Sequence, residues 1–304
     1  MRVTIIAIDG LEYNLVEKWN INTFKQKYYG KHDVTVAVKP GEPLYTPLIW
    51  ASFLLGEPSY IYGYTDKIMK KKRGEVGYSG ILKYLFYIKF SILGTRQLKL
   101  REILLKLGLF KSDKIKEKAH IIESMPSHLL KKTFIQKAID NNLKVKYNSI
   151  PSMPNDKYAE YRVFLYKYFN SSIKDRILIL NKLYNETESD LNNILNNINT
   201  YDLVIYYTPL LDEAHHMLYR PNKPIAMVHL RRYYKLVEKQ FLRIVNSINY
   251  NNSLVLIVSD HGYDPSTHEH SNYGFWSSNL KLEVNPSKIT DFRWIIEKYL
   301  YNYN

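Results

Sequence analysis

The chain has 304 residues, of which 45% are hydrophobic and only 12 each are proline and glycine, a composition typical of a globular protein with a sizeable core. It contains no cysteine, which excludes disulfides, thiolate metal sites and a cysteine nucleophile, so any metal must be held by histidine, carboxylate or hydroxyl groups. The formal net charge of +14 arises between Lys67 and Ile150, where 20 lysines and arginines accompany 6 acidic residues. This basic excess therefore belongs to one segment of the chain.

The first predicted element is a buried strand over Val3–Ile8 (VTIIAI), which ends at Asp9. This apolar run is too short for a signal peptide, and no stretch reaches the roughly 18 apolar residues of a membrane span. We therefore expect a cytoplasmic protein. Asp9 taken alone is explained as a helix N-cap at least as well as by a functional role.

A weaker strand is predicted over Asp33–Val38 (DVTVAV), followed by a helix over Pro47–Leu55 with proline in its first turn. Thr46 lies just ahead of this helix, where exposed backbone N–H groups favour a bound phosphate. An ordinary threonine N-cap explains the same position, so Thr46 alone does not establish a site.

The middle of the chain is rich in Lys, Tyr, Leu and Asn, and its pattern is mostly helical, with breaks predicted at Lys70–Gly74, Gly94, Gly108 and Pro151–Pro154. We predict an α/β core formed by residues 1–65 and 200–304, interrupted by a basic, largely helical insertion over residues 66–199. Above a functional site, such an insertion would act as a cap that steers an anionic substrate.

One segment of the insertion, Gly80–Gly94 (GILKYLFYIKFSILG), is apolar at ten of its thirteen interior positions but too short to span a bilayer. We interpret it as the core helix of the insertion. The alternative is peripheral docking on an anionic membrane surface. Binding of single-stranded nucleic acid is less favoured, because tyrosines are abundant along the whole chain. The sequence does not predict the oligomeric state.

Two further buried parallel strands are predicted over Leu203–Tyr207 and Ser253–Val258, with an amphipathic helix over Ile225–Ile248 between them. The loops after these strands contain Asp212 and Asp260. Because ligands of open α/β sheets bind beyond the carboxyl ends of the strands, these aspartates and the one after the first strand are expected to share a site.

Histidines accompany both of these later aspartates. Asp212 and His216 are four residues apart, which places both on one face of a helix, whereas His215 is expected at the surface. His261 directly follows Asp260, and the same loop continues to His268 and His270. Each pattern arises by chance in isolation, but their combination favours a metal site.

In chain order, the candidate residues are Asp9, Thr46, Asp212, His216, Asp260, His261 and His270. This order and its context resemble the alkaline phosphatase superfamily, and most closely its type I phosphodiesterase/nucleotide pyrophosphatase family. In that family a nucleophilic threonine precedes a helix in a pattern similar to T-x-P-x-W-x-S-x-x-T-G, and Thr46–Gly56 reads TPLIWASFLLG. The Trp, Ser and final Gly agree. The proline stands one position early, Leu55 replaces the second threonine, and Tyr62-Gly63 stands where His-Gly commonly follows. The resemblance covers the core and not residues 66–199.

The resemblance implies an alkaline phosphatase-like, three-layer α/β/α core with a mostly parallel sheet and two divalent metal ions. Zn²⁺ suits the ligands best, with Mn²⁺ or iron as alternatives. One ion would be held by Asp212, His216 and His270, and the other by Asp9, Asp260 and His261 with the Thr46 oxygen. His270 is preferred over His268 because SNYGFW follows it, similar to the family's closing histidine and glycine turn.

The implied activity is hydrolysis of a phosphodiester or pyrophosphate bond in an anionic phosphate ester, such as a nucleotide, through a phosphothreonine intermediate at Thr46. Sulfatases, cofactor-independent phosphoglycerate mutases and alkaline phosphatases proper are disfavoured, because they use other nucleophiles. Two alternatives stay open. One is a phosphomonoesterase with the same site, and the other is a non-catalytic protein that binds a polyanion or a membrane surface.

Overall fold

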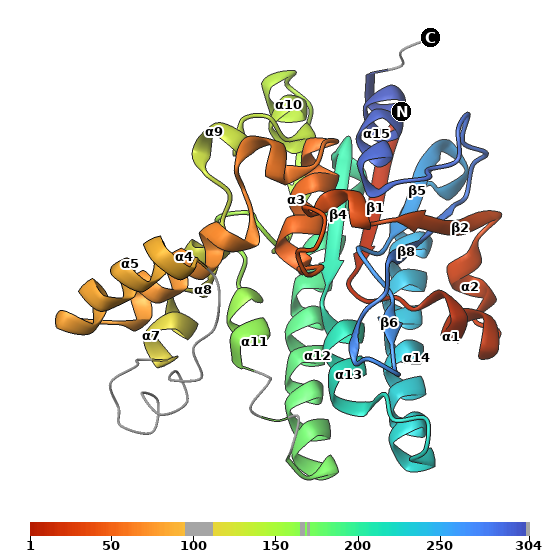
Figure 1. Cartoon of the computed structure of the whole chain (residues 1–304). Coiled ribbons are helices and arrows are strands. Elements are labelled where there is room, and N and C mark those ends of the chain that lie inside the picture. Colours follow the sequence, from red (N-terminus) through yellow and green to blue (C-terminus); the bar gives the residue numbers. More distant parts are fainter. Residues whose placement is uncertain (95–111, 165–167, 169–170, 302–304) are drawn as a thin grey trace.

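The sheet at the centre of the protein has six strands in the order β2-β8-β5-β1-β4-β3 (Figure 1). The computed structural model describes residues 1–94, 112–164, 168 and 171–301. Neighbouring strands from β3 to β5 are parallel, whereas β8 is antiparallel to both β5 and β2. The strands of this sheet are β1 (Arg2–Ile8), β2 (Tyr28–Asp33), β3 (Val145–Tyr147), β4 (Leu203–Thr208), β5 (Ser253–Val258) and β8 (Tyr273–Ser278).

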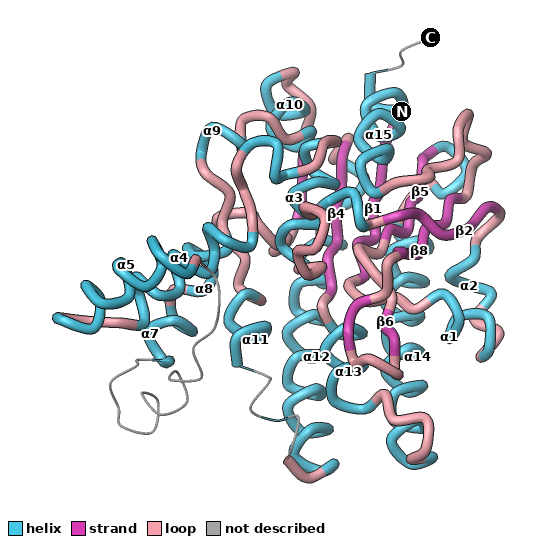
Figure 2. Tube along the Cα trace, viewed as in Figure 1, coloured by secondary structure: helices cyan, strands magenta, loops and turns pink. Residues whose placement is uncertain are grey.

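Helices cover both faces of the sheet (Figure 2). Tyr206 and Tyr207 of β4 identify the two layers, because successive side chains of a strand point to opposite faces. The Tyr206 hydroxyl donates to the Thr187 carbonyl in one layer at 3.2 Å, whereas the Tyr207 ring packs edge-on against Trp50 in the other. The first layer contains α2 (Asn22–Lys25), α12 (Ile173–Leu195), α13 (Leu210–Leu218) and α14 (Pro224–Ser247), and the second contains α3 (Thr46–Leu55), α10 (Phe134–Asp140) and α15 (Phe292–Tyr301). The predicted α/β class with a mostly parallel sheet is confirmed.

The three strands predicted as buried lie at the centre of the sheet. Val3–Ile8 of β1 and every residue of β4 and β5 are buried. Runs of β-branched and aromatic residues that are apolar on both faces fit strands covered on both sides. The helices predicted over Pro47–Leu55 and Ile225–Ile248 are likewise confirmed as α3 and α14.

The strand predicted over Asp33–Val38 is wrong. The chain is extended earlier, in β2, and Thr35–Ala37 forms a 3₁₀ turn. The Asp33 carboxylate accepts hydrogen bonds from the Thr35 N–H at 2.8 Å and from the Thr35 hydroxyl at 2.7 Å, which bends the chain out of the sheet. The polar sequence of β2 lacks the apolar pattern that predicts a strand. This edge strand is stabilised instead by its pairing with β8.

The predicted insertion has two structurally different parts (Figure 1). Residues of its later part join the body of the protein, since β3 pairs with β4 and Phe134 and Leu180 belong to the main core. Its first helices stand to one side of the sheet in Figure 1. The helices not yet named are α1 (Tyr13–Lys18), α4 (Asp66–Gly77), α5 (Ile81–Leu93), α7 (Ser112–Glu117), α8 (Ala119–Glu123), α9 (Ser127–Leu130) and α11 (Ala159–Phe164).

The break predicted at Lys70–Gly74 is wrong, because α4 continues through it. A Cβ added to Gly74 would lie 2.0 Å from Cζ of Phe86 in α5, so this glycine permits close packing of two helices instead of forming a turn. The breaks at Gly94, which ends α5, and at Pro151–Pro154, which forms a turn, are confirmed. The break predicted at Gly108 lies outside the described residues.

The interpretation of the 80–94 segment as the buried core helix of the insertion is wrong. The helix forms as α5, but none of residues 81–92 is buried. The small apolar cluster of this region consists instead of Ile115 and Ile122, with Val76 and Tyr78 packed against them. Among the described residues, no helix has both the length and the apolar character needed to cross a membrane.

Candidate metal centre

Three aspartates meet at the carboxyl ends of β1, β4 and β5, as the sequence predicts. Asp9 follows β1 directly, Asp212 lies in the first turn of α13, and Asp260 is the second residue after β5. The Asp212 N–H donates to the Asp9 carbonyl at 3.1 Å. Gly10 makes this approach feasible, because its φ is +69° and an added Cβ would lie 2.7 Å from the Asp212 Cα.

The first cluster groups Asp9, Asp260 and His261 around one point. Nε2 of His261 lies 3.2 Å from Oδ1 of Asp9 and 3.3 Å from Oδ2 of Asp260. The same nitrogen lies 3.2 Å from Oγ1 of Thr46, the first residue of α3. On the other side of the ring, Nδ1 donates to the Gly262 carbonyl at 2.9 Å, which leaves Nε2 facing the carboxylates.

The second cluster is built on Asp212. Its Oδ1 lies 3.4 Å from Nε2 of His216, 3.7 Å from Nε2 of His270 and 4.0 Å from Nε2 of His261. The rings of His261 and His270 are stacked, with their centroids 3.6 Å apart, so the two clusters adjoin. Every residue predicted as a metal ligand therefore lies within one compact group.

A short hairpin returns His270 to the centre. It consists of β6 (Tyr263–Asp264) and β7 (Glu269–His270), which place His270 opposite Tyr263. His268 lies in the turn with a φ of 60°, and its Nδ1 is 3.2 Å from the Tyr263 hydroxyl. The hairpin therefore explains why His270, and not His268, joins the cluster.

The clusters fit a divalent cation, because buried carboxylate oxygens and imidazole nitrogens converge there, at 3.2–3.4 Å from one another. Oδ1 of Asp9, Oδ1 of Asp212 and Oδ2 of Asp260 are buried and have no hydrogen-bond partner among the described residues. Buried polar atoms without partners are costly, and these three face imidazole nitrogens. Carboxylate oxygen and imidazole nitrogen are ligands that Zn²⁺, Mn²⁺ and iron accept, so the group could bind metal ions of this class.

The electrostatics of the group reflect this concentration of buried charge. Burial raises the pKa of the Asp260 carboxyl well above its usual range, and the neighbouring Asp9 and Asp212 raise it further. Burial alone would lower the pKa of His261, but Asp260, Asp9 and Asp212 together raise it to about 10. A cation with two positive charges is the natural counterpart of these carboxylates.

We expect Asp260→Asn to stabilise the metal-free protein by about 1–2 kcal/mol and to remove its stabilisation by Zn²⁺ or Mn²⁺. Asparagine keeps the oxygen that accepts the Gly10 N–H but removes a buried charge. Urea unfolding with and without metal measures both effects. The matched control is Asp264→Asn, in the same loop but outside the clusters. A destabilised metal-free variant, or one that metal stabilises as it does the wild type, would contradict this assignment.

Glu12, which the sequence analysis did not select, holds the loop that carries the histidines. This buried carboxylate accepts hydrogen bonds from the Tyr263 N–H at 2.8 Å and from the Tyr273 hydroxyl at 2.8 Å. A Cβ added to Gly262 would lie 2.1 Å from Oε2 of Glu12, so the loop approaches closely because residue 262 is glycine. The only signal in the sequence is that Glu12 follows Asp9 by three residues in the same loop.

Tyr207 is a second residue that the sequence analysis did not select for the site. Its hydroxyl donates to Oδ2 of Asp9 at 2.6 Å, so Oδ1 is the Asp9 oxygen that faces His261. Burial raises the pKa of the Tyr207 hydroxyl well above its usual range, and Asp9 raises it further. The hydroxyl therefore remains a hydrogen-bond donor that orients Asp9.

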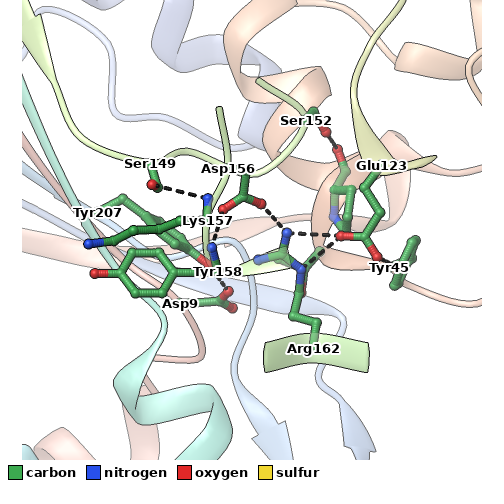
Figure 3. Close-up of polar contacts among 12 residues, drawn as sticks. Asp9, Tyr45, Glu123, Ser149, Ser152, Asp156, Lys157, Tyr158, Arg162 and Tyr207 are labelled. Carbon is green, nitrogen blue, oxygen red and sulfur yellow. Dashed lines mark hydrogen bonds and ion pairs between the residues drawn. The ribbon is translucent and has the colours of Figure 1, made fainter. Parts of the chain in front are cut away.

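Residues of the predicted insertion hold the chain on both sides of Thr46. Before Thr46, the Tyr45 hydroxyl donates to the buried Glu123 carboxylate (Figure 3). After Thr46, the Ser152 hydroxyl donates to the Pro47 carbonyl. The insertion therefore contacts the residues on both sides of Thr46.

Glu123 is also the centre of a buried ion network. Its Oε2 accepts hydrogen bonds from Nε of Arg162 at 3.1 Å and from Nη2 of Arg162 at 2.9 Å. Nη2 of Arg162 also pairs with Asp156, and Nη2 of Arg73 lies 2.9 Å from Oε1 of Glu123. The sequence analysis did not identify this network.

His215 is not at the surface, so the expectation for it is wrong. Its side chain is fully buried, and Nε2 lies 2.9 Å from the Tyr234 hydroxyl of α14. Burial lowers the pKa of His215 to about 3. The reason is that α13 packs against both α12 and α14, which leaves little of its surface exposed.

Comparison with known proteins adds little to this geometry. No protein-family model and no curated protein matches the sequence. Among solved structures, that of the PH0037 protein from Pyrococcus horikoshii superposes with a TM-score of 0.48 at 11% sequence identity. The match covers 100% of this chain and 98% of that chain. A similarity at this level carries no argument about function.

Proposed function

We propose that the protein is a metal-dependent hydrolase of phosphodiester or pyrophosphate bonds, as the resemblance to type I phosphodiesterases and nucleotide pyrophosphatases implies, with Thr46 as nucleophile. One observation carries this proposal. Oγ1 of Thr46 lies 3.2 Å from Nε2 of His261, beside two buried carboxylates whose facing oxygens lack hydrogen-bond partners. A hydroxyl against such a group is placed for activation as a nucleophile.

Two sets of side chains would each hold one metal ion. Asp9, Asp260 and His261 would hold one divalent ion, and Asp212, His216 and His270 a second; Zn²⁺ is favoured over Mn²⁺ or iron. When bound, such ions offset charge on the transferred phosphoryl group and on the attacking and leaving oxygens.

The reaction itself would take place at Thr46. The N–H groups of the first turn of α3 would bind phosphoryl oxygens. Oγ1 of Thr46 would give up its proton to water and bond to phosphorus while the bond to the leaving alcohol or phosphate breaks, and the leaving oxygen would take up a proton from water. Water would then cleave the phosphothreonine and restore the hydroxyl. The substrate is accordingly an anionic phosphate ester.

The test is hydrolysis of bis(4-nitrophenyl) phosphate and 4-nitrophenyl phosphate by the full chain, before and after chelation and after reloading with Zn²⁺ or Mn²⁺. We expect diester hydrolysis that chelation abolishes and metal restores. Faster hydrolysis of the monoester would favour the phosphomonoesterase alternative, which uses the same residues. Hydrolysis of neither compound, combined with tight binding of a polyanion, would favour the non-catalytic alternative.

A further inference from the structure

Helix α5 carries an exposed stripe of large apolar side chains. Ile81, Leu85, Ile88 and Ile92 recur at intervals of four, three and four residues, which places them on one face of the helix. Their side chains are 77%, 52%, 42% and 74% exposed, and Tyr84 beside them is 66% exposed. The exposed apolar side chains therefore give α5 an amphipathic character, with one face that no other described residue buries.

The rest of α5 is attached to α4. The Phe86 ring lies against Gly74 of α4 and packs on Tyr78 with ring centroids 5.4 Å apart. Figure 1 shows α4 and α5 projecting from the side of the protein, away from the sheet. The packing of Phe86 therefore holds α5 against α4, while the apolar stripe stays exposed among the described residues.

The surroundings of the stripe are strongly basic. Residues 66–94 contain seven lysines and arginines and two acidic residues. Both acidic residues are already paired, Asp66 with Lys70 at 2.5 Å and Glu75 with Lys71 at 4.0 Å. The two helices thus present an apolar stripe within a region that has an excess of positive charge, and α5 itself contains no acidic residue.

The area of the stripe argues against a second copy of the chain as its occupant. A helix of 13 residues is about 20 Å long, and a stripe roughly 10 Å wide then offers on the order of 200 Å². A stable protein interface buries roughly 800 Å² on each partner. The stripe alone is too small for that purpose.

An anionic bilayer surface matches both properties. A helix that lies in the membrane interface needs an apolar face to enter the headgroup region and cations to attract anionic lipid. We propose that α4 and α5 dock this protein on the surface of an anionic membrane, with the α5 stripe inserted into the interface. This inference rests on the two helices and does not depend on the chemistry of Thr46.

The test is co-sedimentation of the full chain with phosphatidylcholine vesicles, with and without phosphatidylglycerol. We expect binding to vesicles with phosphatidylglycerol to be at least about 10-fold tighter than to phosphatidylcholine alone, and to weaken with salt. The double variant Ile81→Ser/Ile92→Ser should bind roughly 10-fold or more weakly.

The matched control is Leu178→Ser/Ile225→Ser, which removes side chains that are 70% and 69% exposed on α12 and α14. Its vesicle binding should equal that of the wild type. Equal binding by both double variants, or no binding by the wild type, would overturn the proposal. The proposal would also be overturned if the wild type were a dimer and the α5 variant a monomer, or if that variant had a lower melting temperature. Either result would mean that the stripe packs on protein.

Discussion

Thr46→Ala is expected to reduce hydrolysis of bis(4-nitrophenyl) phosphate by on the order of 10⁴-fold or more, while the protein stays folded and retains its metal. Thr46 contributes the only hydroxyl in contact with Nε2 of His261 among the hydrogen bonds of the described residues. Its replacement removes the proposed nucleophile but no carboxylate or imidazole of the two clusters. Steady-state kinetics, metal analysis of the purified variant and thermal unfolding measure the three parts of this result.

Thr46→Ser is the matched variant, because it keeps a hydroxyl at the same position. We expect it to retain a substantial part of the activity and to form a phosphoryl adduct on the peptide that contains residue 46, detected by mass spectrometry after an acid quench. Thr46→Ala should form no adduct. Full activity of the alanine variant would rule out Thr46 as the nucleophile, even if the metal centre itself were correct.

The central strands could be predicted because their signal is local. β1, β4 and β5 are short apolar runs buried on both faces, a pattern that parallel strands between helices impose on the sequence. β2 could not be predicted in the same way. Its sequence, YYGKHD, is polar, and Gly30 leaves space for the Trp276 ring of β8, so its conformation depends on a partner almost 250 residues away.

The grouping of the candidate metal ligands could be predicted, because the carboxyl ends of parallel strands meet at one edge of the sheet. Asp9, Asp212 and Asp260 each follow a recognisable strand, and that rule needs no knowledge of side-chain packing. Glu12 and Tyr207 were missed for the opposite reason. Their roles arise from partners about 200 residues or more away, Tyr263 and Asp9, and nothing adjacent in the sequence indicates those contacts.

Arg162→Met is expected to lower the free energy of unfolding by about 3–5 kcal/mol, because the buried Asp156 loses its ion-pair partner and the buried Glu123 keeps only Arg73. Glu123 and Asp156 are each only 1% exposed, and Arg162 contacts both. Urea unfolding measures the loss. Lys235→Met is the control, since the Lys235 side chain is 49% exposed in its pair with Glu238, and such pairs contribute less than about 1 kcal/mol.

The same substitution should also lower the activity of the protein that remains folded. Glu123 contacts Tyr45, which directly precedes Thr46. Without Arg162, this carboxylate keeps its contact with Arg73 but loses the two hydrogen bonds on its other oxygen, so it should fix the start of α3 less firmly. Adding Asp156→Asn to Arg162→Met removes the charge of the carboxylate that pairs with Arg162 but not with Arg73. The double variant should recover part of the stability without restoring the position of Tyr45. Activity that recovered in proportion to stability would show that the network supports the fold alone, whereas activity that stayed low would show that the insertion positions the nucleophile.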